Sequence, residues 1–199
     1  MKHHGFSLVE TIVVIGIFVL VMTVLSVFIF NFYRTNAYAI EQSSAIENAR
    51  NGVEKLVQDL REVVPSQGGA YPIESAGLNE VVFFSDVDHD ELVERARYYI
   101  DVENRLIKET TEPMGSPAVY APTPTATEIV AEYIVNSSFG TDLFTFYDDA
   151  GVVIADLDDV DAIRFVEVNL MVNVDPARAP EEFVLHSSAY LRNLQPTLQ

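Results

Sequence analysis

An uncharged and strongly apolar run dominates the hydrophobic pattern of this chain. No residue from Thr11 to Tyr33 carries a charge, and these 23 residues would form a helix about 34 Å long. The hydrocarbon core of a bilayer is about 30 Å thick, so a helix of this length can cross it. The pattern therefore predicts a transmembrane helix over residues 6–33.

Beyond this run the apolar residues are spaced as on one face of an amphipathic helix. They are Ile40, Ile46, Val53, Leu56, Val57, Leu60 and Val64. Pro65 and the glycines that follow it are typical of a helix end. We expect residues 34–64 to continue the same helix, with its apolar face covered by the rest of the chain. Gly52 is the weakest point, since glycine costs up to about 1 kcal/mol against alanine in a helix interior.

The remaining residues, 65–199, alternate between apolar and polar types as β-strands do. Strands are expected at 80–84, 97–102, 105–110, 143–147, 152–155, 165–174 and 183–194. Residues 129–135 fit a strand or a helix, and four prolines between 111 and 125 predict a loop without regular structure. The order of elements predicts an α+β fold, in which a long N-terminal helix packs against an antiparallel β-sheet head made of residues 65–199.

Glu10 is the residue that a simple membrane anchor does not explain. A carboxylate in the hydrocarbon costs about 2.5–3.5 kcal/mol on insertion scales, so a lone acid there indicates a function and needs a partner. If the chain is cut after Gly5, the new amine of Phe6 lies about one helical turn from Glu10. The amine of a neighbouring subunit could then neutralise this carboxylate inside a bundle of packed helices.

The residues Gly5-Phe6-Ser7-Leu8-Val9-Glu10, followed by an uninterrupted apolar helix, resemble the class III leader junction of type IV pilins and type II secretion pseudopilins. The resemblance implies that prepilin peptidase removes residues 1–5 by cutting after Gly5 and then methylates the amine of Phe6. It also implies that Glu10 pairs with the N-terminus of an adjacent subunit. The expected protein is a minor pilin or pseudopilin that primes, caps or enters a type IV pilus-like or type II secretion filament.

The same resemblance implies a set of partners and a subtype. The partners are other pilin or pseudopilin subunits, the prepilin peptidase, an inner-membrane assembly platform and the lipid bilayer. The head resembles J-type pseudopilins and W-type minor pilins at Asp59-Leu60-Arg61, Phe83 to Asp88, Arg97 to Leu106 and Leu191-Arg192-Asn193. The apolar helix lacks the proline that major pilins often carry, which favours a minor subunit. The acid at Glu10 argues against a K-type pseudopilin.

Other interpretations of the N-terminus remain open. A secretory signal peptide would explain the Ala37-Tyr38-Ala39 pattern, but its apolar region spans only about 7–15 residues, and here Arg34 precedes the site. A plain signal anchor on an extracellular domain outside any filament would retain residues 1–5. A buried core helix rarely stays apolar on all sides for so long. A further alternative is an adhesive or DNA-uptake pilin whose head binds a ligand.

The charge distribution predicts where each part of the chain lies. Lys2 is the only lysine or arginine before the apolar run, so the positive-inside rule places the N-terminus in the cytoplasm and the head outside the cytoplasmic membrane. After assembly the head would lie in a periplasmic or cell-surface filament. The chain has 12 basic and 30 acidic residues, a net charge of −18, which disfavours direct binding of nucleic acid.

The sequence offers no set of residues suited to catalysis. It contains no cysteine, no Gly-x-Ser-x-Gly turn, no phosphate-binding glycine loop and no His-Glu-x-x-His helix. We therefore expect no enzyme activity, no catalytic residue and no bound organic cofactor.

One acidic run, Asp86-Val87-Asp88-His89-Asp90-Glu91, raises the question of a metal site. Calcium favours several oxygen ligands, and alternate aspartates begin calcium loops. An EF-hand would need glycine in place of Glu91 and glutamate in place of Arg97, so that motif is absent. A solvated turn is the simpler interpretation. The alternative is a calcium site on Asp86, Asp88 and Asp90, and the run at 156–161 has the same two interpretations.

Overall fold

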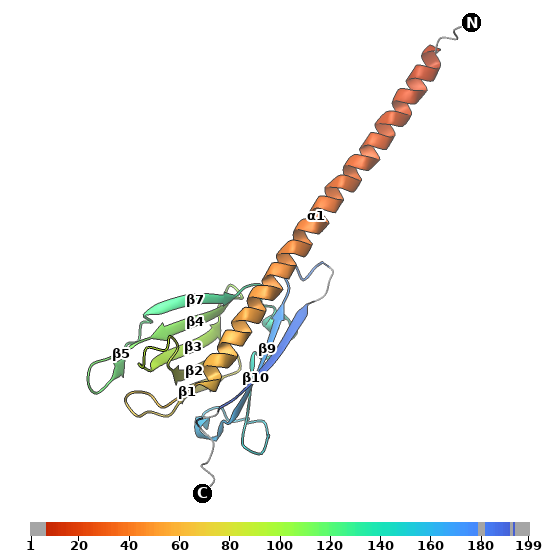
Figure 1. The fold of residues 1–199 in the computed structure, drawn as a ribbon. Helices are drawn as coiled ribbons and strands as arrows, with labels where there is room; N and C mark the ends of the chain where they lie inside the picture. The colour runs from red at the N-terminus through yellow and green to blue at the C-terminus, as the bar shows by residue number, and fades with distance from the viewer. Residues whose placement is uncertain (1–6, 179–181, 192, 194–199) are drawn as a thin grey trace. The chain divides into compact units, whose positions relative to one another are not determined.

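The computed structural model describes residues 7–178, 182–191 and 193 (Figure 1). The leader residues 1–5 and Phe6 lie outside the described residues. The chain divides into two compact units, residues 1–42 and 43–199, and one helix, α1 (Leu8–Arg61), contributes to both. A long N-terminal helix followed by antiparallel sheets confirms the predicted α+β class.

Within the first unit, α1 is uncharged and strongly apolar from Thr11 to Tyr33. Its most apolar 18-residue window has a mean hydropathy of 3.1, and none of that window is buried in the protein. The hydroxyls of Thr23 and Ser26 each donate to the carbonyl four residues earlier, at 2.8 Å. Polar groups that are satisfied within the helix can enter hydrocarbon at little cost. In the part of the chain that the structure describes, α1 alone is long and apolar enough to cross a membrane.

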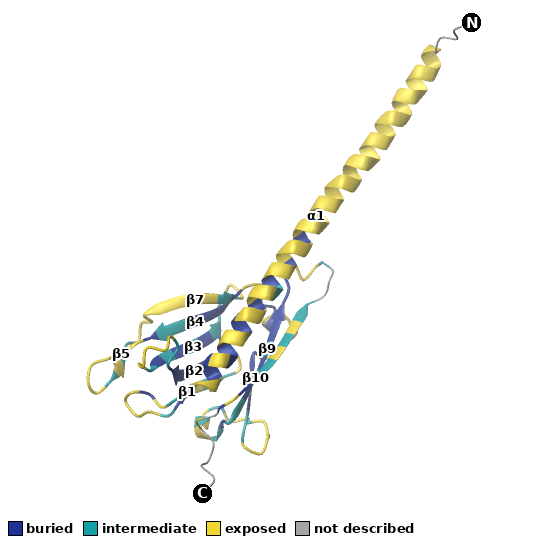
Figure 2. Cartoon of the chain, in the orientation of Figure 1, coloured by how far each residue is buried: buried dark blue, intermediate teal, exposed yellow. Residues whose placement is uncertain are grey.

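The second unit holds one hydrophobic core, and α1 forms one wall of it (Figure 2). The buried face of α1 is made of Ala45, Ala49, Val53, Leu56, Val57 and Leu60. These residues recur every three or four positions, as an amphipathic helix requires. The expected face was wrong at its N-terminal end, because Ile40 is 61% exposed and Ile46 is only half-buried. Two small residues, Ala45 and Ala49, take that place and let the helix approach the strands closely.

Two larger antiparallel sheets and a short two-stranded ladder complete the described part of the second unit (Figure 1). The five-stranded sheet has the order β1 (Ile73–Gly77), β2 (Glu80–Ser85), β3 (Glu94–Ile100), β4 (Leu106–Thr111) and β7 (Ala126–Ala131). The three-stranded sheet has the order β10 (Phe183–Tyr190), β9 (Phe165–Val172) and β8 (Phe144–Tyr147). The shorter elements are β5 (Pro113–Met114), β6 (Val119–Tyr120), α2 (Asn136–Phe139) and a 3-10 turn at Val160–Ala162.

Several local expectations differ from the structure for identifiable reasons. α1 ends at Arg61, three residues before Val64, because the Val64 N–H instead donates to the carbonyl of Phe84 at 2.9 Å. The proline-rich segment does contain a regular ladder, which pairs Pro113 with Tyr120, so the prediction of an irregular loop was wrong there. Proline fits because it stands at the first residue of a two-residue strand. The expected strand at 152–155 is reduced to a single bridge at Val153.

A buried polar contact joins α1 to the five-stranded sheet. The Lys108 Nζ atom lies 2.6 Å from Asp59 Oδ2, and the Tyr98 hydroxyl donates to the same oxygen at 2.6 Å. The Lys108 and Asp59 side chains are 3% and 9% exposed, and the Phe83 ring stacks on Tyr98. Burial, and next the Asp59 charge, raise the pKa of the Tyr98 hydroxyl well above its usual value. Removing one partner of such a pair costs about 3–5 kcal/mol, because the other charge is left buried alone.

Gly52 of α1 lies directly against Val130 of β7. A Cβ atom at this position would stand 2.5 Å from Val130 Cγ1 and 2.7 Å from the Val130 carbonyl oxygen. Real Cβ atoms essentially never come so close to another atom, and the carbonyl belongs to a paired strand. The glycine that weakens the isolated helix is therefore what allows the helix and the strand to touch.

We expect Gly52→Ala to destabilise the protein by about 1–3 kcal/mol, as overpacking does, although alanine is the better helix former. The measurement is urea or thermal unfolding of the full chain in detergent, followed by circular dichroism. Gly16→Ala is the matched control, since nothing lies within 4 Å of its added Cβ, and it should unfold like the wild type. A Gly52→Ala variant as stable as the wild type would contradict the close contact.

Candidate functional site

The first candidate site is the beginning of α1. Ser7 precedes the helix, and its Oγ atom accepts the N–H of Glu10 at 3.2 Å. Ser7-Leu8-Val9-Glu10 has the spacing of a capping box, in which serine caps the helix and glutamate stands in its first turn. Glu10 is exposed on this first turn. The sequence-based reasoning missed this capping role of Ser7, although the Ser-x-x-Glu spacing was there to reveal it.

The local role of Glu10 is small compared with the cost of an acid inside the bilayer. A carboxylate in the first turn gains about 0.3–1 kcal/mol from the helix dipole. Its cost at the centre of a bilayer is about 2.5–3.5 kcal/mol, so the dipole leaves most of that cost uncompensated. The residues expected to supply the compensating amine, Gly5 at the cut and Phe6 after it, lie outside the described residues.

The fold has a pilin-like α+β architecture, and its one long apolar helix near the N-terminus is consistent with a single-pass membrane anchor. Residues 1–26 match the family model described as the prokaryotic N-terminal methylation motif. This motif is the signature of type IV pilins and pseudopilins, and it supports a pilin-like substrate of prepilin peptidase. Searches of curated proteins and of solved structures gave no match to this chain.

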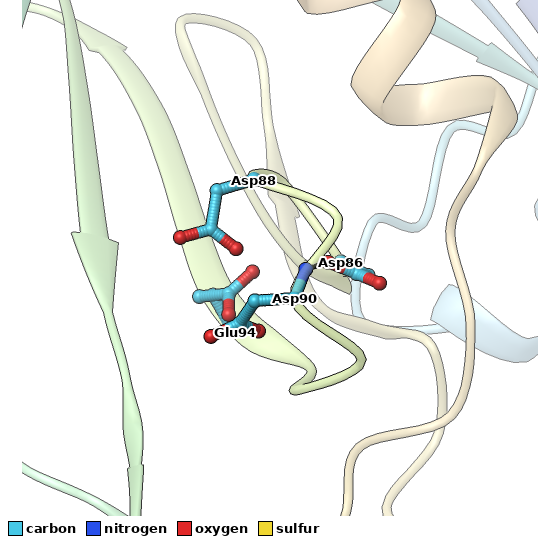
Figure 3. A group of neighbouring side chains, drawn as sticks. All are labelled: Asp86, Asp88, Asp90 and Glu94. Carbon is cyan, nitrogen blue, oxygen red and sulfur yellow. Dashed lines mark hydrogen bonds between the residues drawn. The ribbon is translucent and has the colours of Figure 1, made fainter.

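The second candidate site is the loop between β2 and β3. Figure 3 shows the side chains of Asp86, Asp88, Asp90 and Glu94, which lie side by side there. Each offers one carboxylate oxygen, and these oxygens all lie within 4.8 Å of one another. Glu94 was missed by the sequence-based reasoning because it lies in β3, outside the acidic run. The register brings it to the loop, since it pairs with Ser85 at the end of β2.

Backbone hydrogen bonds hold this loop in shape. Asp86 accepts the N–H groups of Asp90 and Glu91 at 3.1 and 3.2 Å, and Glu94 accepts the N–H of Val87 at 2.7 Å. Glu91 adopts a positive φ of 74°. These bonds are what an ordinary aspartate-rich turn needs, and they require no ion.

The charges in the loop are nevertheless crowded. Burial raises the pKa of the Glu94 carboxyl, and the nearby charges of Asp88 and Asp90 raise it further, against the lowering effect of the Val87 N–H. A calcium ion takes six to eight oxygen ligands and would relieve the repulsion among four carboxylates. The calcium site therefore stays a prediction, with Glu94 added to the three aspartates. Among the described residues, the run at 156–161 forms no such group.

We expect calcium to raise the melting temperature of the full chain if the loop binds it. At a calcium concentration ten times the dissociation constant, the gain in unfolding free energy is about 1.4 kcal/mol. The variant with both Asp86→Ala and Asp88→Ala should lose the calcium-dependent shift, whatever its own stability. A matched variant with Asp156→Ala and Asp158→Ala should keep it. Equal melting temperatures with calcium and with chelator would leave the loop as a turn.

Proposed function

We propose that this chain is a minor pilin or pseudopilin that is built into a filament, or primes or caps one, and that it is not an enzyme. The observation that carries the proposal is Glu10, an acid in the first turn of a helix that is apolar on all sides and matches the methylation motif. The filament is a type IV pilus-like or type II secretion filament. Within it the chain is a J-type or W-type subunit.

The exposed apolar surface of α1 supports a helix that moves from lipid into a bundle of like helices. Lipid tails are as apolar as leucine, so apolar burial alone gives little preference for the bundle over the bilayer. Polar contacts then decide the register. Cleavage after Gly5 would leave a cationic amine on Phe6, next to the positive end of the helix dipole. The Glu10 carboxylate of a neighbouring subunit would neutralise the amine charge and the positive end of the dipole. It would do so in a medium where charge-assisted hydrogen bonds are strong.

The assembly partners follow from this mechanism. Prepilin peptidase would produce the Phe6 amine, and an inner-membrane assembly platform would bring the subunits together. Lys2 favours a cytoplasmic N-terminus, which leaves the acidic head on the outer side of the cytoplasmic membrane. The net charge of −18 supports protein partners for the head rather than DNA.

One observation favours the alternative of a head that binds a ligand. Three aromatic residues form a row across the outer face of the three-stranded sheet, since Tyr147 and Tyr190 both pair with Phe165. The ring centroids of Tyr147 and Phe165 are 5.4 Å apart, and those of Phe165 and Tyr190 are 6.5 Å apart. Tyr190 is 44% exposed. An adhesive pilin would present its binding residues in such a place.

Processing gives the first test of the proposal. Mass spectrometry of the protein from its native host should show a chain that begins at N-methylated Phe6. The reason is that residues 1–26 match the N-terminal methylation motif, and the resemblance to pilins implies a cut after Gly5 and methylation of Phe6. A mature chain that begins after Ala39, or one that retains Met1, would contradict the assignment.

Glu10→Val gives the second test, which separates assembly from membrane anchoring. The substitution removes a charge from the apolar segment, so insertion and cleavage should be at least as efficient as in the wild type. Incorporation should fail, because the unpaired amine of the neighbouring Phe6 is costly in a dry bundle. The measurement is the share of processed protein that co-purifies with filament subunits, and Glu10→Asp should keep part of it.

The control for Glu10→Val is Thr11→Val. It changes the adjacent residue and removes the Thr11 hydroxyl that bonds to the Ser7 carbonyl, but it leaves the carboxylate in place. It should be processed and incorporated like the wild type. Wild-type incorporation of Glu10→Val would show that Glu10 has no pairing role.

A further inference from the structure

The buried contact between α1 and the five-stranded sheet has the composition of a reactive group. It combines an amine, a carboxyl group and a hydroxyl donor, and its three side chains come from three different elements. Lys108 Nζ is 2.6 Å from Asp59 Oδ2, which places it within about 3.9 Å of the carboxyl carbon, since a C–O bond is about 1.3 Å long. That separation is close to the 3–3.5 Å at which bound groups begin to react.

The three side chains of this group are largely buried, and the nearest further charge is Glu128, which lies opposite Lys108 in the β4–β7 ladder. The Lys108 and Asp59 side chains are 3% and 9% exposed. The Tyr98 ring is fully buried, stacks on Phe83 with centroids 6.0 Å apart, and lies 5.5 Å from Lys108 Nζ. Tyr98 and Lys108 are directly opposite each other in the β3–β4 ladder, so both side chains are held on one face of the sheet.

We infer that Lys108 and Asp59 form an intramolecular amide bond after the protein folds. One proton moves from Lys108 Nζ to Asp59 Oδ2 over their 2.6 Å hydrogen bond, which gives a neutral amine and a neutral acid. The amine nitrogen attacks the carboxyl carbon. A second proton passes from this nitrogen to Oδ2, through the Tyr98 hydroxyl that already bonds there, and Oδ2 leaves as water. The three protons of the ammonium group end as one amide N–H and one water molecule.

The geometry supplies what the uncatalysed reaction lacks. Folding holds the Lys108 amine and the Asp59 carboxyl group in contact, so the reaction does not depend on a rare encounter between them. Burial of both side chains limits the access of water, which hydrolysis of the product would need. The bond would tie α1 to β4, so that force on the helix cannot pull it from the sheet. This inference rests on the buried contact of Asp59, Tyr98 and Lys108 alone and does not depend on the proposed filament.

Lys55 and Glu128 provide a comparison within the same chain. Their side chains meet at nearly the same distance, 2.7 Å, but they are 44% and 55% exposed. Water reaches both groups and competes for the carboxylate. Contact without burial should therefore leave Lys55 unmodified.

Tryptic digestion of the purified full chain tests the bond directly. Trypsin does not cut after an acylated lysine. A linked chain should give one species that joins residues 56–61 to residues 106–164, lighter than the two peptides by one water molecule. Cleavage after Lys55 should proceed normally and serves as the internal control. An unlinked chain gives residues 106–108 and 109–164 as separate peptides, and their exclusive recovery from folded, aged protein would overturn the inference.

Two variants distinguish the covalent bond from a buried ion pair. Lys108→Arg keeps a cation opposite Asp59 but cannot form the amide, so the linked species should vanish while circular dichroism stays that of a folded protein. Tyr98→Phe keeps the ring over Lys108 but removes the hydroxyl. It should fold and link several times more slowly than the wild type, measured as linked fraction against time. Linking at the wild-type rate would rule out proton transfer by Tyr98.

Discussion

The contact of Asp59 on α1 with Lys108 and Tyr98 inside the core sets how the helix lies on the sheet. A buried polar group tolerates little displacement, because its contacts with its partners have to be kept within tenths of an ångström. Helix rotation by one residue would carry Asp59 off the sheet and bring a different face inward. The contact therefore specifies one arrangement of helix and sheet, which apolar contacts alone define less sharply.

Small residues along the same face make that arrangement possible. Ala45 and Ala49 are buried where longer apolar side chains were expected, and Gly52 leaves no room for a Cβ against Val130. The cost of glycine in the helix, about 1 kcal/mol, is offset by the contact with β7 that it permits. At Gly52, helix propensity favours alanine whereas packing against Val130 favours glycine, and the packing effect is the larger.

The sequence predicted the features that depend on periodicity and missed those that depend on distant partners. The apolar run, the α+β class and the β9 alternation follow from local pattern, and the structure contains them. The alanine face of α1 was missed because alanine gives a weak hydrophobic signal. Glu94 was missed because only the pairing of β2 with β3 places it beside the aspartates of the loop. The Asp59–Lys108 pair spans 49 positions, and no local pattern marks either residue as buried.

For Glu10, the free energies of capping, of the helix dipole and of desolvation bear on whether its role is local or intermolecular. Capping and the helix dipole explain why an acid is acceptable in the first turn of α1, and together they are worth about 1 kcal/mol. A helix end at the membrane surface needs no more than that, because water reaches the carboxylate. An end drawn into an apolar interior loses that water, and insertion scales put an acid at the bilayer centre at about 2.5–3.5 kcal/mol. Under the proposed assembly, the same carboxylate would cost little at the surface and would need a cation once the helices pack. A subunit amine that arrives with the packing would meet this need, so the proposal has the acid act in assembly without being required for insertion.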